Sequence, residues 1–258
     1  MTGAAGRWEK AAQAYATGEH KTGVELQLVV DFAAPTGTER VLDIGTGAGH
    51  TALALAPKVA RVVLTDPVDA MLAAARGLFQ DAGVRNAEFV AASAERLPFP
   101  AASFDIVTTR LAAHHFDDVV RAMREVARVL RPSGLFVFID TVAPENAESA
   151  AFQHEVESLR DPTHRRIYPQ GEWIAVCEHA GFRVVKTETV RKAHDFEAWL
   201  ERGGADPATR TRVRERFLTA PPSAVMDLAI VVGDGAVISF TDRKLVLAAR
   251  GTEERPLP

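Results

Sequence analysis

Cysteine is nearly absent from the sequence. The 258 residues include one cysteine, Cys177, which cannot form an internal disulfide framework or a cysteine-based zinc cluster. The histidines and aspartates show no tight ligand spacing either, so we expect no metal site. The cysteine count fits a reducing compartment, and we predict a cytoplasmic protein.

Long apolar runs and a strong charge of one sign are missing as well. No apolar run approaches the roughly 18 residues of a membrane-spanning helix. Residues 1–20 lack the apolar core of a signal peptide, so we expect a soluble, unexported protein. The net charge of -4 gives no global positive field for nucleic acid, and there is no basic, aromatic-rich stripe. We therefore expect a small-molecule substrate and no nucleic acid, in a protein that is compatible with a homo-oligomer.

What the sequence does contain is a regular alternation of strands and helices. Up to residue 140, short apolar strands predicted at 40–44, 61–65, 88–91, 104–108 and 135–139 alternate with helices predicted at 7–34, 50–58, 68–83 and 117–131. Strands this apolar are typical of a parallel sheet covered by helices on both faces, which predicts an α/β fold. Two further strands are predicted at 182–186 and 244–249.

A glycine-rich segment follows the first predicted strand. The strand at 40–44 leads into Gly45-Thr46-Gly47-Ala48-Gly49. Glycines let the backbone approach a ligand closely, and the next helix aims its first N–H groups at that ligand. A dinucleotide fingerprint places Gly or Ala at position 50, where this chain has His50. Asp43 adds a carboxylate that disfavours a pyrophosphate and suits an amino group or a sulfonium.

A second acidic residue, Asp66, ends the second strand. It follows Asp43 by 23 residues, and an acid about 20 residues beyond such a loop can accept hydrogen bonds from ribose hydroxyls. The alternative is that Asp66 is the N-cap of the next helix, with Pro67 at its first position. With the glycine loop in register, we favour the ribose contact.

Together these segments resemble the class I S-adenosylmethionine-dependent methyltransferases, in the group similar to the ubiquinone/menaquinone C-methyltransferases (methyltransferase type 11). The resemblance is carried by VLDIGTGAGH (41–50), LTDPVDAML (64–72), SAERLPFPAASFDIV (93–107), AAHHF (112–116) and REVARVLRPSGLFVFID (124–140). It implies a Rossmann-like, doubly wound, seven-stranded sheet of order 3-2-1-4-5-7-6 with the last strand antiparallel. It also implies S-adenosyl-L-methionine as cofactor and S-adenosyl-L-homocysteine as product.

The resemblance further implies an organisation of the chain. We predict a single domain over residues 1–258, with an N-terminal helical segment at 7–34 lying over the cofactor. The cofactor-binding core is predicted at 40–140. Segments 141–180 and 188–235 are the candidate lid or substrate-side helices.

Cofactor contacts are implied at the positions that match the family motifs. The glycine loop would wrap the methionine part, Asp43 would lie near its amino group, and Asp66 would bind the ribose. The full implied set is Asp43, Gly45, Thr46, Gly47, Gly49, Asp66, Pro67, Ser93, Ala94, Glu95, Arg110 and Tyr15. The family usually has Asp at the adenine-binding position where this chain has Ser93, which accepts more weakly and is equally well explained as a turn residue. For Tyr15, packing against a helix is favoured over closing the pocket.

Methyl transfer needs alignment of the reacting atoms, and a general base only when the acceptor loses a proton. His114 and His115 follow the fourth strand and are candidate bases, against a packing or capping role for one of them. Asp140, at the end of the fifth strand, is a weaker candidate whose alternative is capping a loop. The polar cluster at 161–168 could bind an acidic group, but we favour a solvated loop.

Two other functions compete with methyl transfer. A nicotinamide-dependent oxidoreductase is disfavoured by His50 and Asp43. A non-catalytic adenosylmethionine-binding module stays open, because a fold alone does not establish a reaction. The sequence does not identify the acceptor.

Overall fold

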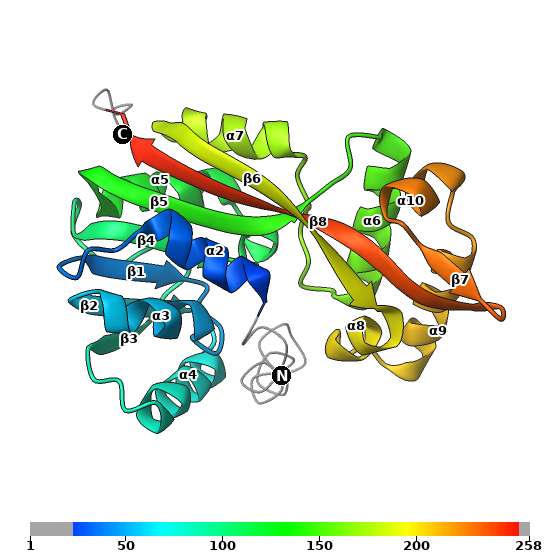
Figure 1. Cartoon of the computed structure of the whole chain (residues 1–258), viewed down its shortest axis with the longest axis horizontal. Coiled ribbons are helices and arrows are strands. Elements are labelled where there is room, and N and C mark those ends of the chain that lie inside the picture. The colour runs from blue at the N-terminus through cyan, green and yellow to red at the C-terminus, as the bar shows by residue number, and fades with distance from the viewer. Residues whose placement is uncertain (1–22, 253–258) are drawn as a thin grey trace.

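The computed structural model of the chain describes residues 23–252 (Figure 1). The predicted helix at 7–34 is represented by its last part, α2 (Val24–Ala33). Residues 7–22, and with them Tyr15, lie outside the described residues.

A mixed β-sheet forms the centre of the structure. Its strands are β1 (Arg40–Ile44), β2 (Arg61–Asp66), β3 (Ala87–Ala91), β4 (Phe104–Arg110), β5 (Leu130–Val142), β6 (Phe182–Asp195), β7 (Val231–Gly233) and β8 (Ala236–Gly251). The order is β3-β2-β1-β4-β5-β8-β6, with β7 paired to β8 alone. Strands β1 to β5 pair in parallel, and β8 is antiparallel to β5 and to β6. Apart from the short β7, this is the predicted order 3-2-1-4-5-7-6, so the fold prediction is confirmed.

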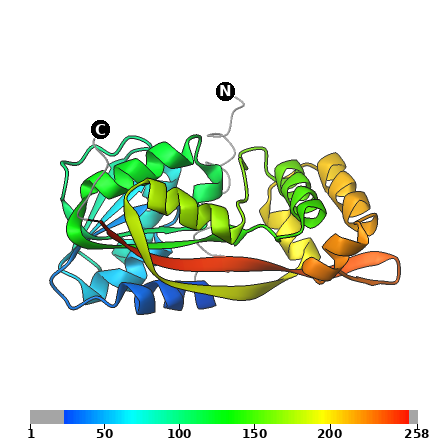
Figure 2. The same cartoon turned by 90° about the horizontal axis from the view of Figure 1, so that it is seen from above.

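Helices cover both faces of the core sheet. They are α2, α3 (His50–Leu55), the 3-10 turns η2 (Ala56–Lys58) and η3 (Ala113–His115), α4 (Asp69–Asp81), α5 (Val119–Val129) and α7 (Gln170–His179). Successive β1 side chains enter different apolar clusters: Val41 packs with Phe79 of α4, and Leu42 with Met123 of α5. Figure 2 shows the blue helices below the sheet and the green ones above it. The alternation explains why these strands read as wholly apolar.

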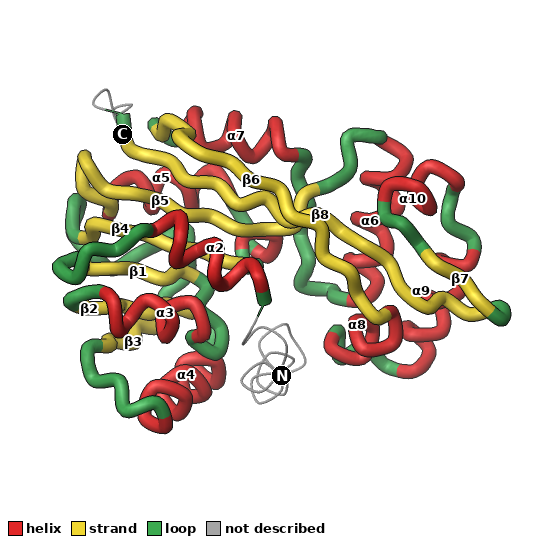
Figure 3. Tube along the Cα trace, viewed as in Figure 1, coloured by secondary structure: helices red, strands yellow, loops and turns green. Residues whose placement is uncertain are grey.

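The strands β6 and β8 continue well beyond this core. Figures 1 and 3 show them running as a long ribbon into a second lobe. That lobe contains α6 (Ala147–Arg160), α8 (Phe196–Arg202), α9 (Pro207–Leu218), α10 (Pro222–Asp227) and β7. It has its own apolar cluster, which includes Phe152, Trp199, Phe217 and Phe240. The position of the lobe depends on the ribbon that enters it.

Two predictions about this region were wrong in extent. The predicted strands at 182–186 and 244–249 are the ends of strands that span Phe182–Asp195 and Ala236–Gly251. Segment 188–235 therefore starts as a strand, not as a helix. The missed part of β6 is largely exposed and charged, because its backbone is held by pairing with β8 and not by burial of an apolar face. Within residues 23–252, no helix is both long enough and apolar enough to span a bilayer.

Candidate active site

The glycine loop has the backbone that its sequence predicts. Gly45, Gly47 and Gly49 have φ values of 61°, 53° and 87°, a region that favours glycine. A Cβ on Gly45 would lie 2.6 Å from Ala112 Cβ, so this position requires close packing. A Cβ on Gly47 would meet nothing within 4 Å. Gly45 and Gly47 line the large cavity described below, so bare backbone faces that space.

Asp66 ties this loop to β2. Its Oδ2 accepts a hydrogen bond of 2.9 Å from Gly47 N, and its Oδ1 accepts one of 2.9 Å from Val68 N. Burial raises the pKa of Asp66, although both N–H donors oppose the rise. Asp66 and Pro67 line the cavity. The N-cap alternative was wrong, because α4 begins at Asp69 and its N-cap residue is Val68.

Asp43 lies behind the loop. Its two carboxylate oxygens accept hydrogen bonds from the hydroxyls of Thr46, at 2.5 Å, and Thr108, at 2.6 Å. Burial raises the pKa of Asp43, with the hydroxyls and the charge of Arg110 opposing. Arg110 Nε in turn donates to Thr51 Oγ1 at 2.9 Å. Asp43, Thr46 and Arg110 thus brace the loop, and their predicted contacts with the methionine end of a cofactor stay predictions.

The turn after β3 forms another edge of the cavity, to which Ser93, Ala94 and Glu95 contribute. The Ser93 carbonyl accepts from Arg96 N at 3.2 Å, so Ser93 is a turn residue and also faces the cavity. Glu95 Oε1 accepts from Asp117 N at 3.0 Å and links this turn to the start of α5. The adenine contact of this turn stays a prediction.

On the other side of the loop, His114 forms a close pair with the buried Asp140. His114 Nδ1 lies 2.6 Å from Asp140 Oδ1, and the His114 backbone N–H donates to Oδ2 at 3.0 Å. Asp140 is 0% exposed, and its Oδ1 also accepts from Thr141 N at 2.7 Å. Burial alone would lower the pKa of His114, but the charge and hydrogen bond of Asp140 outweigh it, so the pKa is raised. Asp140 therefore orients an imidazole that lines the cavity.

Two further histidines lie against His114. The ring centroids of His115 and His164 are 4.1 Å and 5.4 Å from that of His114. Burial and the charge on His114 lower the pKa of His115 to about 3 and that of His164 to about 4. Among these three rings, His114 is therefore the one that takes up a proton most readily.

The solvated-loop prediction for 161–168 was wrong in part. Asp161, Thr163 and His164 are buried, because Asp161 Oδ1 accepts from Thr163 and draws the turn inward. Arg165 and Arg166 are exposed, as expected of a solvated loop.

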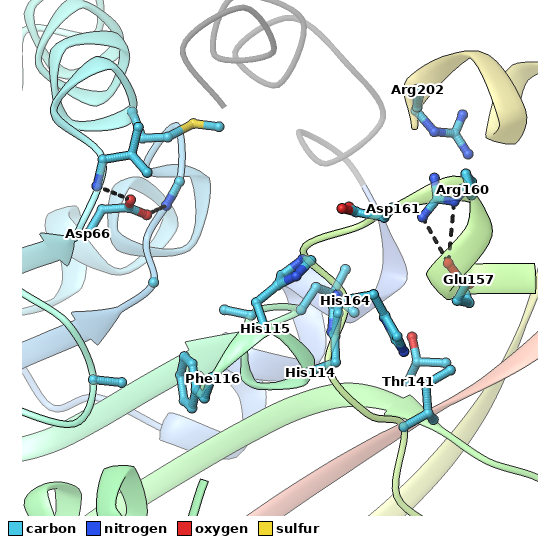
Figure 4. A pocket seen from close by; sticks show the side chains of 18 of the residues that line it. Asp66, His114, His115, Phe116, Thr141, Glu157, Arg160, Asp161, His164 and Arg202 are labelled. Carbon is cyan, nitrogen blue, oxygen red and sulfur yellow. Dashed lines mark hydrogen bonds and ion pairs between the residues drawn. The ribbon is translucent and has the colours of Figure 1, made fainter. Parts of the chain in front are cut away.

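One cavity of about 340 Å³ connects these parts (Figure 4). It runs from the glycine loop and Asp66, past His114 and His115, to the second lobe. The lining residues that sequence reasoning did not assign are chiefly Thr141, Glu157, Arg160, Lys192, His194, Trp199, Arg202, Asp242 and Lys244. The alternation of Asp242 and Lys244 before an apolar run was a weak signal for buried charges on one face of a strand. No cluster of metal-ligating side chains was found within residues 23–252.

Comparison with known proteins places this geometry in context. Residues 42–138 match the family described as a methyltransferase domain. The uncharacterized methyltransferase YcgJ of Bacillus subtilis is 41% identical over 190 residues, which cover 74% of this chain and 75% of that protein. Its crystal structure has a TM-score of 0.83 at 35% identity and covers 89% of this chain and 98% of YcgJ.

Two other similarities extend this result. The structure of BH2331 from Bacillus halodurans has a TM-score of 0.85 at 35% identity, covering 88% of this chain and 99% of that one. The ubiquinone/menaquinone biosynthesis C-methyltransferase UbiE of Pseudomonas putida is 36% identical over 124 residues, which cover 46% of this chain and 48% of UbiE.

Proposed function

Since the chain belongs to the methyltransferase family, we propose that it transfers a methyl group from S-adenosyl-L-methionine to a small-molecule acceptor. The observation that carries the proposal is the continuous cavity, which joins the glycine loop and Asp66 to His114 and the second lobe. Its volume of about 340 Å³ lies in the usual range of small-molecule sites. A nicotinamide-dependent oxidoreductase is not favoured by the similarities found.

The nucleoside end fits an adenosyl sulfonium. Each Asp66 oxygen accepts one backbone hydrogen bond and, as a carboxylate oxygen, can accept a second from a ribose hydroxyl. The open space at Gly47 admits a ligand against the backbone. The charged residues that line this end, Asp66, Glu95 and Asp117, are all acidic, which suits a cationic ligand. When bound, S-adenosyl-L-methionine supplies an activated methyl group for in-line displacement.

The acceptor end offers an oriented imidazole. Since Asp140 holds His114 Nδ1, the other ring nitrogen is the one that can exchange a proton with an acceptor. Asp140 is a positioning residue in this scheme, and His114 acts as the base once it is neutral. His115 and His164 remain neutral and pack against it. The base is required only for an acceptor that loses a proton.

Calorimetry with S-adenosyl-L-homocysteine tests the nucleoside end. We expect binding to the wild type and at least a tenfold weaker affinity in Asp66→Ala, because two charge-assisted hydrogen bonds are lost. Asp69→Ala, three residues away and exposed, is the matched control and should bind like the wild type. No binding to the wild type, or equal affinity in Asp66→Ala, contradicts the proposal. Formation of S-adenosyl-L-homocysteine in the presence of an acceptor separates an enzyme from a binding module.

A further inference from the structure

The far end of the cavity has a continuous polar wall. We define this distal wall as Thr141, Arg160, His194, Trp199, Asp242 and Lys244, all of which line the cavity. From the His114–Asp140 pair it starts at Thr141, whose hydroxyl accepts from Lys244 Nζ at 2.7 Å. Lys244 Nζ also donates to Asp242 Oδ2 at 2.7 Å, and His194 Nε2 lies 3.0 Å from the same oxygen.

A series of ring contacts connects His194 to Arg160 along the distal wall. His194 stacks on Phe240 with centroids 4.9 Å apart, and Phe240 meets Trp199 at 4.9 Å. The guanidinium of Arg160 lies over the Trp199 ring, 4.4 Å from its centroid. A Cβ on Gly203 would come within 2.5 Å of Arg160 Cγ, so Arg160 packs on the chain directly after Arg202. Figure 4 shows the Arg160 and Arg202 side chains together at this end.

The two cationic side chains of the distal wall have N–H groups that make no hydrogen bond. Arg160 uses three of its five N–H groups, two on Glu157 Oε2 and one on the Trp199 carbonyl. Lys244 uses two of its three. Among residues 23–252, the remaining N–H groups of these two side chains have no partner. The neighbouring acids Glu157 and Asp161 are engaged by Arg160 and Thr163.

Three buried polar atoms at the same place lack a hydrogen bond as well. Within the described range they are Asp242 Oδ1 and both ring nitrogens of His194, although Nε2 lies 3.0 Å from Asp242 Oδ2. A carboxylate oxygen accepts hydrogen bonds, and a neutral imidazole donates from one nitrogen and accepts at the other. These atoms suit a polar group of a ligand, such as a hydroxyl or an amino group.

From this geometry we propose that the methyl acceptor is a small organic acid whose carboxylate binds at the distal wall, with the spare N–H groups of Arg160 and Lys244 as donors. This rests on the proposed function and names its substrate class. The acid group would be fixed at the far end, so that the rest of the molecule reaches toward His114 and the glycine loop. The acidic side chains that line the nucleoside end would favour the cationic donor there, and the spare N–H groups of Arg160 and Lys244 would favour the acid at the other end.

Matched pairs of acids and amides test this inference. Ligand-observed NMR on the protein loaded with S-adenosyl-L-homocysteine compares 4-hydroxybenzoate with 4-hydroxybenzamide, and lactate with lactamide. We expect at least one acid to bind at least about tenfold more tightly than its amide, since only the acid makes charge-assisted hydrogen bonds. Acids that bind no better than their amides, or do not bind, overturn the proposal.

Variants locate the binding in the cavity. The double variants Glu157→Gln/Arg160→Gln and Asp242→Asn/Lys244→Gln, each of which removes both charges of an ion pair together, should each weaken binding of the acid about tenfold or more. Arg212→Gln, on the exposed side of α9, is the control and should leave the acid affinity unchanged. Acid affinity that is unchanged in both cavity variants overturns the proposal. Calorimetry with S-adenosyl-L-homocysteine distinguishes this inference from the proposed function. If the proposed function is wrong, S-adenosyl-L-homocysteine does not bind. If only this inference is wrong, S-adenosyl-L-homocysteine binds and the acids show no preference.

Discussion

Replacing Asp140 with asparagine removes the charge that holds His114 and keeps the size of the side chain. Asp140 is 0% exposed, the His114 side chain is 17% exposed, and Asp140 Oδ1 lies 2.6 Å from His114 Nδ1, so solvent screens the pair only weakly. Removing one partner of a buried pair costs about 3–5 kcal/mol. We expect Asp140→Asn to lose free energy of unfolding of that order at pH 6.

The loss should shrink as the pH rises. Burial lowers the pKa of His114, but Asp140 outweighs it and the pKa is raised. The stability that this shift gives is fully present below the unfolded histidine pKa of about 6.5 and is lost as pH rises through the folded value. Burial raises the pKa of Asp140, but the charge of His114 outweighs it and the pKa is lowered, so its contribution is lost only in acid. The difference between wild type and variant is therefore larger at pH 6 than at pH 9.

Urea unfolding at pH 6 and pH 9 measures this difference. His115 and His164, with pKa values lowered to about 3 and about 4 by burial and by the charge on His114, stay neutral at both pH values in the wild type. The control is Asp117→Asn, whose side chain is 78% exposed and ion-paired with Arg165, and it should change stability by less than about 0.5 kcal/mol. A gap of equal size at both pH values, or one no larger than that of the control, refutes the reasoning.

Two further outcomes follow from the site. Gly45→Ala should lower the thermal unfolding temperature more than Gly47→Ala, since both positions have positive φ but only Gly45 has a neighbouring Cβ at 2.6 Å; equal losses would contradict this. With an acceptor that must lose a proton, kcat should rise with pH through the raised pKa of His114, and Asp140→Asn should move that rise to lower pH. A pH–rate profile that does not move in the variant excludes His114 as the base.

The structure of the glycine-loop end of the cavity was predictable from sequence because its parts are local. The glycine loop spans five consecutive residues, and its positive φ angles are the reason for the glycines. Asp66 ends the strand next to β1, so the register of two parallel strands brings it to the loop. The N-cap alternative for Asp66 failed although Asp-Pro suits a helix start, because here the carboxylate accepts hydrogen bonds from Gly47 and Val68 ahead of the helix.

The distal wall was not predictable in the same way. Thr141 and Lys244 are hydrogen-bonded but lie 103 positions apart in the chain. Lys192 and His194 lie on the part of β6 whose polar sequence resembles a surface segment. Only the pairing of β6 with β8 brings these side chains to the cavity, and that pairing leaves no local periodic signal.

The ribbon of β6 and β8 separates two tasks that a transferase must combine. The proposed nucleoside contacts lie at one end of the sheet, whereas Lys192, His194, Asp242 and Lys244 lie on the protruding strands β6 and β8. Exchanging the protruding parts of β6 and β8, with the second lobe, between homologous chains would therefore change which acceptor is preferred. The affinity for the methyl donor would stay the same. Chimeras of two homologous chains, joined at the paired positions Val142 of β5 and Arg243 of β8, would test this separation. Their acceptor preference and their affinity for the methyl donor would be measured separately.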